Sequence, residues 1–231
     1  MTSTEPTAAD RNLRQRDLVP PETLASVHAV VIGVGAVGRQ VALQLAALGA
    51  PKMTLYDPDI VGVENLAPQG FWERDLGDLK VRAVAQVALQ QFPEMNLHAV
   101  PHRFRTSDVR AWPPDRSVAV FACVDAIDAR RLIWDATSAR AAFFADGRLA
   151  AEVVRVLASA APHPAGYART LFPAGEADAG SCTAKATIYA ASVAAGLMLA
   201  QFARWLRGQP LTTDQTLNLL AAELTVAGPI L

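Results

Sequence analysis

The fold is decided by residues 27–41, which read VHAVVIGVGAVGRQV. A valine-rich apolar run ends at Gly33, and Gly35 and Gly38 follow at the spacing of a glycine-rich turn that joins a strand to a helix. Gly33 can bend without steric cost, Gly35 lets a ligand approach the backbone, and Gly38 lets the helix lie close to its strand. The stretch predicts the entrance to a nucleotide-binding α/β fold and leaves NAD, FAD, S-adenosylmethionine and ATP open as ligands.

The helix expected after this turn has one apolar stripe at helical spacing. The stripe consists of Val37, Val41, Leu45 and Leu48. The N-terminal N–H groups of this helix would face phosphate or ribose oxygens, because the helix dipole makes that end positive.

The second expected strand, residues 52–56, ends at Asp57, which lies about twenty residues past the glycines. A carboxylate at that strand end can accept hydrogen bonds from ribose hydroxyls. A turn carboxylate without a ligand is the other interpretation, and the spacing favours the ribose role.

The composition suits one α/β domain with a sizeable core, because the 231 residues are 52% hydrophobic and 19% charged. The net charge of −1 argues against a nucleic-acid-binding protein, since phosphate binding needs clustered excess cation. Cys123 and Cys182 stand far apart, which disfavours a disulfide framework and suggests a cytoplasmic setting. No apolar run has membrane-spanning length and no signal peptide is found, so we expect a soluble protein.

A polar loop is expected over residues 63–71, and residues 75–80 lead into a helix that runs to about Gln91. Asp78 is the expected N-cap of this helix. Lys80 then lies in the first helical turn, where a cation is unfavourable against the helix dipole. Two interpretations stay open for Lys80: an anionic partner nearby, or an ordinary surface lysine.

Two further strands are expected at residues 96–100 and 117–123. Asp125 follows the second of them at the carboxyl edge, where ligands bind in open α/β sheets. Asp128 would cap or flank the next helix. Cys123 lies inside the apolar strand, so we interpret it as a packing residue and not as a nucleophile.

Several more elements are expected in the C-terminal half. They are strands at 142–145 and 152–158, a long loop over 160–180, a nearly apolar helix from about Thr183 to Gly208, and a last strand over 216–226. The apolar helix should be buried or pack in a dimer. The predicted fold is therefore α/β and Rossmann-like: a mainly parallel sheet flanked by helices, extended by additional strands in the C-terminal half.

Six separated motifs occur in one order along the chain. They are RNLRQ at 11–15, GVGAVG at 33–38, DPD at 57–59, NLAPQ at 65–69, DLGDLK at 75–80, and Asp125 with the arginine pair that follows it, Arg130 and Arg131. Together they make the chain resemble the adenylyltransferases of the ThiF, MoeB and HesA type, which are related to ubiquitin-activating enzymes. On this resemblance, residues 1–20 form an N-terminal arm and residues 21–231 a single ThiF-type adenylation domain.

The resemblance implies activation of a carboxylate by ATP, usually the C-terminal glycine of a small ubiquitin-like or sulfur-carrier protein, as an acyl adenylate. Such a reaction brings like charges together, so it needs cations and a metal ion. The family motifs imply the site residues as follows: Gly33, Gly35 and Gly38 form the nucleotide-facing turn, Asp57 binds the ribose, Asn65 and Gln69 lie beside the triphosphate, Lys80 contacts phosphate, and Asp125 holds Mg2+.

Two more residues have roles that the resemblance suggests. In the family the early arginine, here Arg14, reaches the nucleotide of the partner subunit, which implies a homodimer. Cys182 precedes the expected C-terminal helix, whose dipole would favour a thiolate, and lies where relatives carry a loop with a cysteine. We expect Cys182 to accept the acyl group as a thioester, with a packing residue as the alternative. A separate conjugating or sulfur-transfer protein would then take over.

Two departures from the family pattern matter. The family loop usually reads Asn-Leu-x-Arg-Gln, and here Pro68 stands at the arginine position, so one phosphate-binding cation is missing. Arg74, a few residues on, could replace it. The paired Cys-x-x-Cys motifs of many relatives are also absent, so no structural zinc is expected.

Two other functions stay open. The glycine turn and Asp57 also fit an NAD-dependent oxidoreductase, which would bind NAD without magnesium. Pro68 fits a degenerate relative that binds a nucleotide or a protein partner without catalysis. The sequence does not identify the protein or peptide that would be activated.

Overall fold

A computed structural model describes residues 11–163, 166–171 and 186–227. The strands are β1 (Val27–Ile32), β2 (Lys52–Tyr56), β3 (Asn96–Val100), β4 (Ser117–Ala122), β5 (Ala141–Ala150), β6 (Val153–Ala160), β7 (Asp214–Asn218) and β8 (Glu223–Val226). The α-helices are α2 (Pro21–Ala25), α3 (Ala36–Leu48), α4 (Val63–Gln69), α5 (Lys80–Gln91), α6 (Ile127–Thr137) and α7 (Ile188–Leu206). Short 3-10 turns are η1 (Glu73–Asp75), η2 (Thr106–Ala111) and η3 (Tyr167–Thr170).

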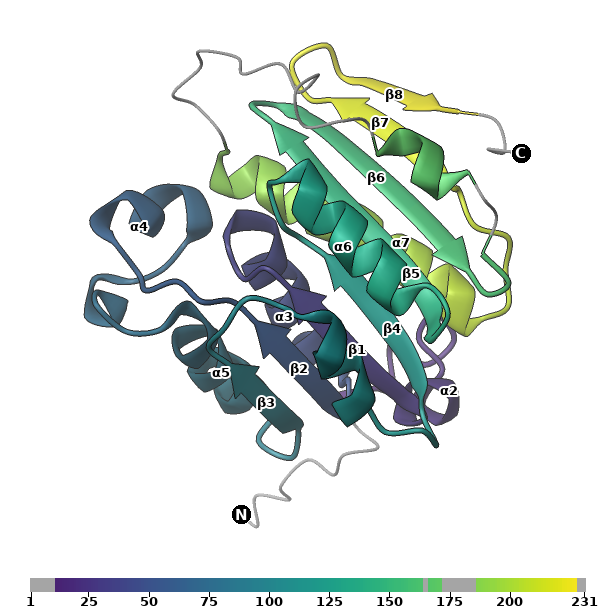
Figure 1. Cartoon of the computed structure of the whole chain (residues 1–231), viewed down its shortest axis with the longest axis horizontal. Helices are drawn as coiled ribbons and strands as arrows, with labels where there is room; N and C mark the ends of the chain where they lie inside the picture. The colour runs from purple at the N-terminus through teal and green to yellow at the C-terminus, as the bar shows by residue number, and fades with distance from the viewer. Residues whose placement is uncertain (1–10, 164–165, 172–185, 228–231) are drawn as a thin grey trace, which may run out of the picture.

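All eight strands belong to one sheet, in the order β3-β2-β1-β4-β5-β6-β7-β8 (Figure 1). The first five of this order run parallel to their neighbours, and β6, β7 and β8 are added antiparallel. The predicted Rossmann-like sheet with additional C-terminal strands is therefore confirmed. The strands expected at 52–56 and 96–100 are found with those bounds.

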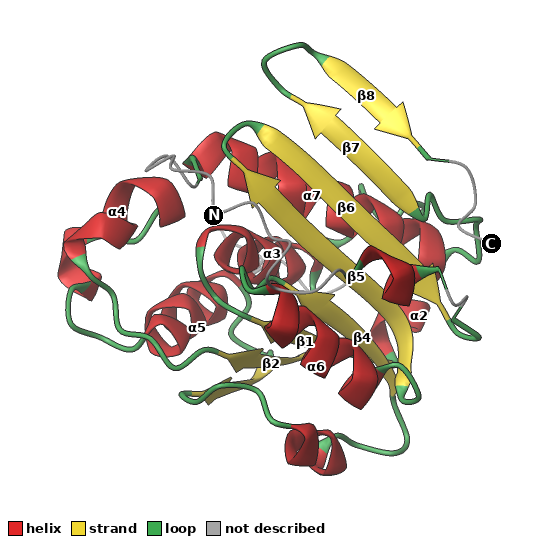
Figure 2. Cartoon of the chain, turned by 45° about the horizontal axis from the view of Figure 1, so that its top comes forward, coloured by secondary structure: helices red, strands yellow, loops and turns green. Residues whose placement is uncertain are grey.

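Helices cover both faces of the sheet, as alternating apolar side chains on its strands require. In β1, Ala29 and Val31 belong to one buried cluster, which α3, α5 and α7 cover. Val30 and Ile32 belong to a second cluster on the opposite face, under α6. Figure 2 shows α6 in front of the sheet and α7 behind β5 and β6.

The strand order reverses direction at β1, which pairs with β2 on one side and with β4 on the other. Ligands of open α/β sheets bind at such a switch point, outside the carboxyl ends of the strands. The glycine turn follows β1 and Asp125 follows β4, so both lie at this edge.

The prediction of a loop over residues 63–71 is wrong in part, because Val63–Gln69 forms α4. Asn65 Oδ1 accepts a hydrogen bond from Gly62 N at 2.9 Å at the start of the helix. Gly70 ends it with a left-handed φ of 76°, and its N–H bonds to the carbonyl of Leu66 at 2.9 Å. The polar composition hid a helix whose two ends are capped by local contacts.

Two other boundaries differ from the prediction. The last strand expected over 216–226 is a hairpin, because the Asn218 side chain accepts from Leu220 N and Ala221 N and turns the chain between β7 and β8. Asp78 is not the N-cap of α5, since Leu79 takes that position and no side chain caps it. The described C-terminal helix runs from Ile188 to Leu206, and its expected start near Thr183 lies outside the described residues.

No described helix has the length and apolarity that crossing a bilayer would require. The nearly apolar α7 is instead buried in the domain: its face with Ala194, Met198 and Phe202 packs in the cluster that covers the sheet. Of the two predicted outcomes for this helix, burial within its own domain is therefore confirmed.

His28 lies in β1 on the α6 face of the sheet and is only 2% exposed. Its Nε2 is 2.9 Å from Thr54 Oγ1 in β2, while its Nδ1 has no partner among the described residues. Burial lowers the pKa of His28 from 6.5 to about 4, and the charges of Lys52 and other cations add to this effect. The folded protein thus holds a neutral imidazole at neutral pH.

We expect this histidine to make the fold sensitive to acid. Between pH 6.5 and about 4 the unfolded chain binds a proton at His28 that the folded chain does not, so stability is complete above this window and falls as the pH falls through it. The lowered pKa of His28 corresponds to a loss of about 2–4 kcal/mol in the free energy of unfolding across this pH range. Urea unfolding from pH 7.5 to 4 should show His28→Gln losing less stability than wild type.

The control for this series is His98→Gln, on the exposed face of β3. This variant should stay close to the wild-type curve, because the charge of His98 comes after burial and Lys52 among the causes that lower the pKa of His28. Parallel curves for His28→Gln and wild type would contradict a neutral buried His28.

Candidate active site

Two glycines of the turn after β1 are required by close packing. A Cβ on Gly33, whose φ is 86°, would lie 2.7 Å from the carbonyl oxygen of Cys123, which follows β4. A Cβ on Gly38 would lie 1.8 Å from the carbonyl oxygen of Gly33. Both distances are far below contact distance, so Gly33 and Gly38 let β1, β4 and α3 converge and bring the N-terminus of α3 to the carboxyl edge.

Gly35 has a different surrounding. It is the N-cap of α3, and an added Cβ would lie at ordinary contact distance, 3.7 Å, from Gln69 Oε1. That oxygen is buried and has no hydrogen-bond partner among the described residues. The structure thus brings the Gln69 amide, at the end of α4, close to the glycine turn. Its expected place beside a triphosphate stays a prediction. A buried acceptor without a donor is costly, so a bound ligand at this place is a natural partner.

Asp57 directly follows β2 and is 6% exposed. Its Oδ2 accepts from Val34 N in the glycine turn at 2.6 Å, and its Oδ1 accepts from Asp59 N at 2.9 Å. Burial raises the pKa of Asp57, and the two N–H donors oppose that rise. The carboxylate therefore ties the glycine turn to β2, and each oxygen keeps a second lone pair for a ligand.

Lys80 is the first residue of α5 and is buried, with its side chain 7% exposed. Its Nζ lies 3.2 Å from Asp59 Oδ2, and its backbone N donates to the Asp59 carbonyl at 2.9 Å. The anionic partner that the sequence suggested is thus Asp59, whose side chain is 58% exposed. This burial rules out an ordinary surface lysine. The ion pair with Asp59, two residues after Asp57, holds the ammonium group near the carboxyl end of β2.

Asn65 is 8% exposed and bonds to Gly62 N, as described above. This bond gives Asn65 a local role in starting α4. The same bond stabilises the start of the helix that carries Gln69, so Asn65 helps to position Gln69 beside the glycine turn.

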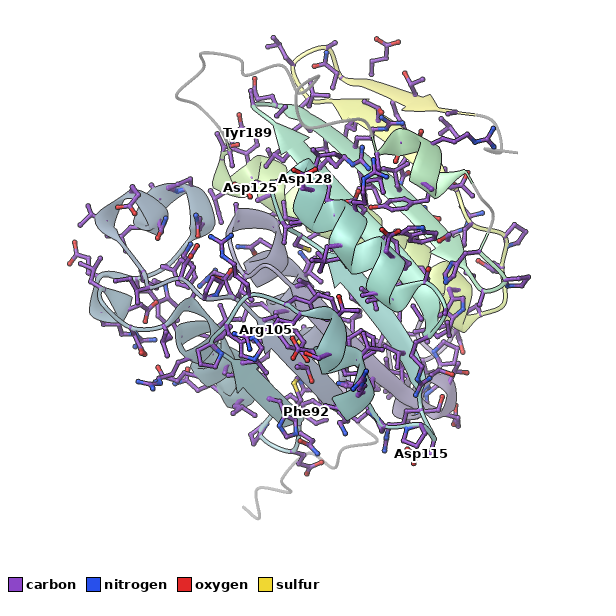
Figure 3. All side chains as sticks on the ribbon, viewed as in Figure 1. Phe92, Arg105, Asp115, Asp125, Asp128 and Tyr189 are labelled. Carbon is purple, nitrogen blue, oxygen red and sulfur yellow. The ribbon has the colours of Figure 1, made fainter. Side chains whose placement is uncertain are left out.

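Asp125 is exposed and lies beyond the end of β4, and Asp128 is exposed in the first turn of α6. Figure 3 shows both at the N-terminal end of α6. Among the described residues no group of three or more His, Cys, Asp and Glu side chains could hold a metal ion. A lone carboxylate suits magnesium, which keeps water and substrate phosphates as its other ligands. Asp125 therefore fits a metal that arrives with a nucleotide.

Arg14 does not lie at this edge of its own chain. The segment that carries it contacts the other end of α3: Arg11 donates to the Ala46 carbonyl at 3.3 Å, and Gln15 donates to the Leu48 carbonyl at 3.0 Å. The Arg11 guanidinium also stacks 4.7 Å from the ring centroid of Phe92, which Figure 3 places at the opposite end of the molecule from Asp125. Arg14 itself is exposed there.

The two cysteines have different outcomes. Burial raises the pKa of the Cys123 thiol to about 12, so this residue is a protonated packing group, as predicted. Cys182 lies outside the described residues, and its expected role as a nucleophile stays a prediction.

Arg74, expected as a substitute for the missing arginine, points to solvent, with its side chain 64% exposed. Its guanidinium stacks on Trp72 at 3.9 Å from the ring centroid and lies 3.9 Å from Asp75. These contacts hold it on the outer side of η1.

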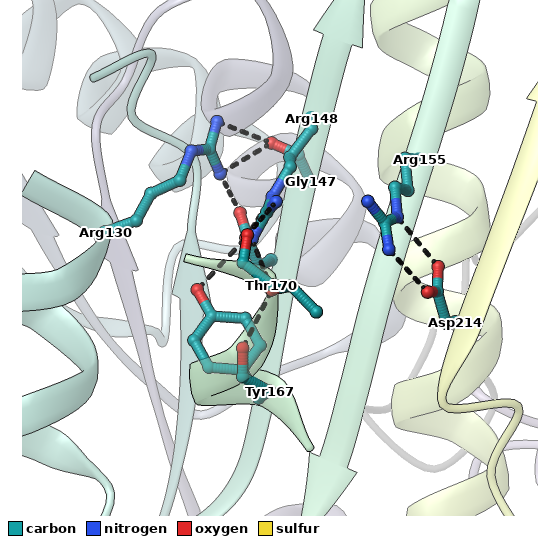
Figure 4. Close-up of polar contacts among 8 residues, drawn as sticks. Arg130, Gly147, Arg148, Arg155, Tyr167, Thr170 and Asp214 are labelled. Carbon is teal, nitrogen blue, oxygen red and sulfur yellow. Dashed lines mark hydrogen bonds and ion pairs between the residues drawn. The ribbon is translucent and has the colours of Figure 1, made fainter. Parts of the chain in front are cut away.

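Sequence reasoning missed a charged cluster beside this edge. Asp146 in β5 is fully buried and forms ion pairs with Arg130 of α6 and Arg148 of β5, the latter at 2.7 Å (Figure 4). Tyr167 of η3 donates to Asp146 Oδ2 at 3.0 Å. Burial lowers the pKa of Arg130 to about 10 and also lowers that of Arg148. The only available signal was an Asp-Gly-Arg sequence inside an otherwise apolar strand.

This cluster fixes the wall of the site next to β4. Asp146 pairs with Ala122, the last residue of β4, so β5 continues past the carboxyl edge. Arg130 also donates to the Gly147 carbonyl at 3.3 Å, and Arg148 donates to Thr170 at 3.0 Å and 2.9 Å. The first turns of α6, which follow Asp125, are thereby anchored to the sheet.

The carboxyl edge thus combines a glycine turn at a helix N-terminus, a buried lysine, an unpaired amide oxygen and an exposed carboxylate. Backbone N–H groups, a cation and a carboxylate that can hold a metal are the groups that bind a polyphosphate. The arrangement can accept an anionic nucleotide and stabilise charge that develops on its phosphates.

Comparison with known proteins agrees with this geometry. A family model described as the ThiF family matches residues 10–226. The protein named Uncharacterized protein y4qC, from Sinorhizobium fredii, is 27% identical over 117 residues, which are 51% of this chain and 20% of that protein. The chain therefore spans about a fifth of this relative.

Solved structures share the fold. The crystal structure of PaaA has a TM-score of 0.74 at 18% identity and covers 98% of this chain and 76% of its own. The structure of E. coli MccB with ATP has a TM-score of 0.70 at 16% identity, covering 96% of this chain and 71% of MccB. E. coli MccB with MccA-N7isoASN has a TM-score of 0.72 at 14% identity, with 96% and 72% covered.

The Asp146 cluster predicts a large cost for removing its negative charge. Asp146→Asn would leave Arg130 and Arg148 buried without a counter-charge, which costs about 3–5 kcal/mol in comparable pairs. Arg82→Ala serves as the control. Arg82 of α5 pairs with Asp78, which precedes the helix, and because the arginine side chain is 63% exposed this pair should contribute about 0–1 kcal/mol. Equal losses in denaturant unfolding would show that the cluster does not stabilise the fold.

Proposed function

Because the chain belongs to the ThiF family, we propose that it is an ATP-dependent adenylyltransferase that activates the terminal carboxylate of a small protein or peptide. The observation that carries the proposal is the family match over residues 10–226, which includes every motif at the carboxyl edge. The structural relative MccB, crystallised with ATP and in other crystals with MccA, supports both the nucleotide and the kind of partner.

In the proposed reaction, a carboxylate oxygen of the partner attacks the α-phosphorus of ATP. The bond between this phosphorus and the oxygen that bridges to the β-phosphate breaks, and pyrophosphate leaves. The products are an acyl adenylate and pyrophosphate. Because an anion attacks a polyanion, the site must supply positive charge where negative charge accumulates.

The residues at the carboxyl edge would divide this work. The N-terminus of α3, opened by Gly35, would direct backbone N–H groups at the phosphates. Asp57, already bound to Val34 N, would take a ribose hydroxyl with its remaining lone pairs. Lys80 would contact phosphate. Its side chain is only 7% exposed, so water weakens the attraction between its ammonium group and a phosphate less than it would at the surface. Gln69 Oε1, which has no donor among the described residues, would accept a hydrogen bond from the ligand.

Magnesium fits the same site. Asp125 would hold the ion together with nucleotide phosphates, and the ion would neutralise charge on the departing pyrophosphate. The exposure of Asp125 leaves room for the waters that magnesium retains.

Arg14 supports a homodimer as part of the proposal. Because its segment is bound at the far end of α3, this arginine could complete a nucleotide site only in another copy of the chain. The proposed assembly is therefore two chains, each placing Arg14 at the site of its partner.

The activated partner and the fate of its acyl group form the finer part of the proposal. The family resemblance favours a ubiquitin-like or sulfur-carrier protein that ends in Gly-Gly, whereas the likeness to MccB keeps other short carboxyl-terminal segments open. Cys182 would accept the acyl group and release AMP, and a separate conjugating or sulfur-transfer protein would take it from there.

The test is ATP–pyrophosphate exchange with a panel of proteins and peptides that includes Gly-Gly termini. Wild type should exchange with at least one member, and Lys80→Ala and Asp125→Ala should lose about a hundredfold or more. Arg82→Ala, on the exposed face of α5, is the control and should keep full exchange. Full exchange by Lys80→Ala or Asp125→Ala would remove these residues from the site.

A thermal-shift series separates this function from the alternatives. ATP with magnesium should raise the melting temperature and NAD should not. Stabilisation by NAD alone would favour an oxidoreductase. Stabilisation by ATP with no exchange across the panel would favour a nucleotide-binding relative without catalysis.

The thioester has its own test. After reaction with ATP and a partner, non-reducing gels should show an adduct that thiol removes and that Cys182→Ala lacks. An adduct that persists in Cys182→Ala would exclude this cysteine as the acceptor.

A further inference from the structure

Arg39 is a buried arginine whose charge the structure leaves without a direct counter-ion. It lies in the second turn of α3 and is 6% exposed. Among the described residues it takes part in no ion pair and in no hydrogen bond of its side chain, and its guanidinium stacks 5.2 Å from the ring centroid of Phe71. Burial lowers the pKa of Arg39, and the more distant charge of Asp75 raises it. A buried charge without a partner is costly, so its retention calls for an explanation.

The guanidinium lies at the glycine-turn end of α3. The backbone N of Arg39 donates to the Gly35 carbonyl at 3.0 Å, which puts Arg39 one turn after the N-cap. Side chains on a helix lean toward its N-terminus. Arg39 Nη1 would be 3.1 Å from a Cβ on Gly70, directly after α4. The guanidinium is thus held between the first turns of α3 and the end of α4.

Its position is unfavourable unless an anion is present. The N-terminal end of a helix carries positive partial charge, which repels a cation placed there. Beside it, Gln69 Oε1 lies buried and unpaired 3.7 Å from the Cβ position of Gly35. Among the described residues, a largely buried guanidinium with no ion pair or side-chain hydrogen bond and a buried amide oxygen with no hydrogen bond therefore flank the N-terminus of α3 on the side of α4.

We propose that Arg39 binds the triphosphate of ATP and supplies, from α3, the positive charge that Pro68 removes from α4. The inference rests on the proposed function. Pro68 is separated from Gly70, the neighbour of the Arg39 guanidinium, by Gln69 alone. Residues two apart on a helix do not share a face, but an arginine side chain at position 68 is long enough to reach past the end of α4, so the proposed charge can come from either helix. Arg74 is not an equivalent source, since it stacks on Trp72 with 64% of its side chain exposed.

The experiment compares ATP with adenosine, which lacks the phosphates. Calorimetry measures ATP affinity, and ligand-observed NMR measures adenosine affinity, since it tolerates weak binding. Arg39→Gln should weaken ATP binding about 10- to 100-fold, the range expected for one lost charge-assisted hydrogen bond. Adenosine affinity should stay within about twofold, which also shows that the site is still folded. Arg82→Gln, exposed on α5, is the matched control and should change neither affinity.

A second variant tests whether a positive charge at position 68 can replace the charge of Arg39. Adding Pro68→Arg to Arg39→Gln should restore ATP affinity by about tenfold or more, because the charge returns to the same place from α4. The inference is overturned if Arg39→Gln keeps its ATP affinity, if it loses ATP and adenosine equally, or if the loss appears in Arg74→Gln instead. If wild type itself binds no ATP, the proposed function fails, which is a different result.

Discussion

The fold and the candidate site both depend on one close approach, between the glycine turn after β1 and the chain that leaves β4. Gly33 lies against the Cys123 carbonyl, and Gly38 lies against the Gly33 carbonyl, at distances where any Cβ would collide. This contact holds the N-terminus of α3 at the switch point of the sheet. The backbone that makes the packing possible is thus the same backbone that a phosphate would meet.

Several buried charged side chains lie around this contact, and they differ in how fully an opposite charge pairs with them. Asp146 is neutralised by Arg130 and Arg148, and this cluster connects α6, β5 and η3 in one rigid wall. Lys80 has one carboxylate, on a half-exposed side chain. Arg39 has no carboxylate within ion-pair distance in the part of the chain that the structure describes, and it stacks on Phe71. The fully paired charge therefore stabilises the scaffold, and the less fully paired charges lie where we propose that the nucleotide binds.

Much of the fold could be predicted from local patterns. Valine-rich runs, the glycine spacing and strand-end carboxylates located β1, β2, β3, β4 and the turn between β1 and α3, because each of these signals lies within a few residues of the chain. The predictions that failed concern segments with weak local patterns. The α4 segment is polar and contains Pro68, yet Asn65 and Gly70 cap it as a helix. The strand expected over 216–226 is split by a turn that the Asn218 side chain stabilises.

The sequence by itself determined that a Rossmann-like sheet carries a nucleotide-type turn, and it placed Asp57 and Asp125 at one edge, because strand direction brings the ends of parallel strands together. For Lys80 and Gln69 the family motifs implied a place at the same site. Only the tertiary structure decided which of these groups are paired. Asp57 bonds to Val34, Lys80 to Asp59, and Asp146 lies between two arginines from separate elements. Burial and orientation of a side chain are set by the packing of elements distant in the chain, which no local pattern records.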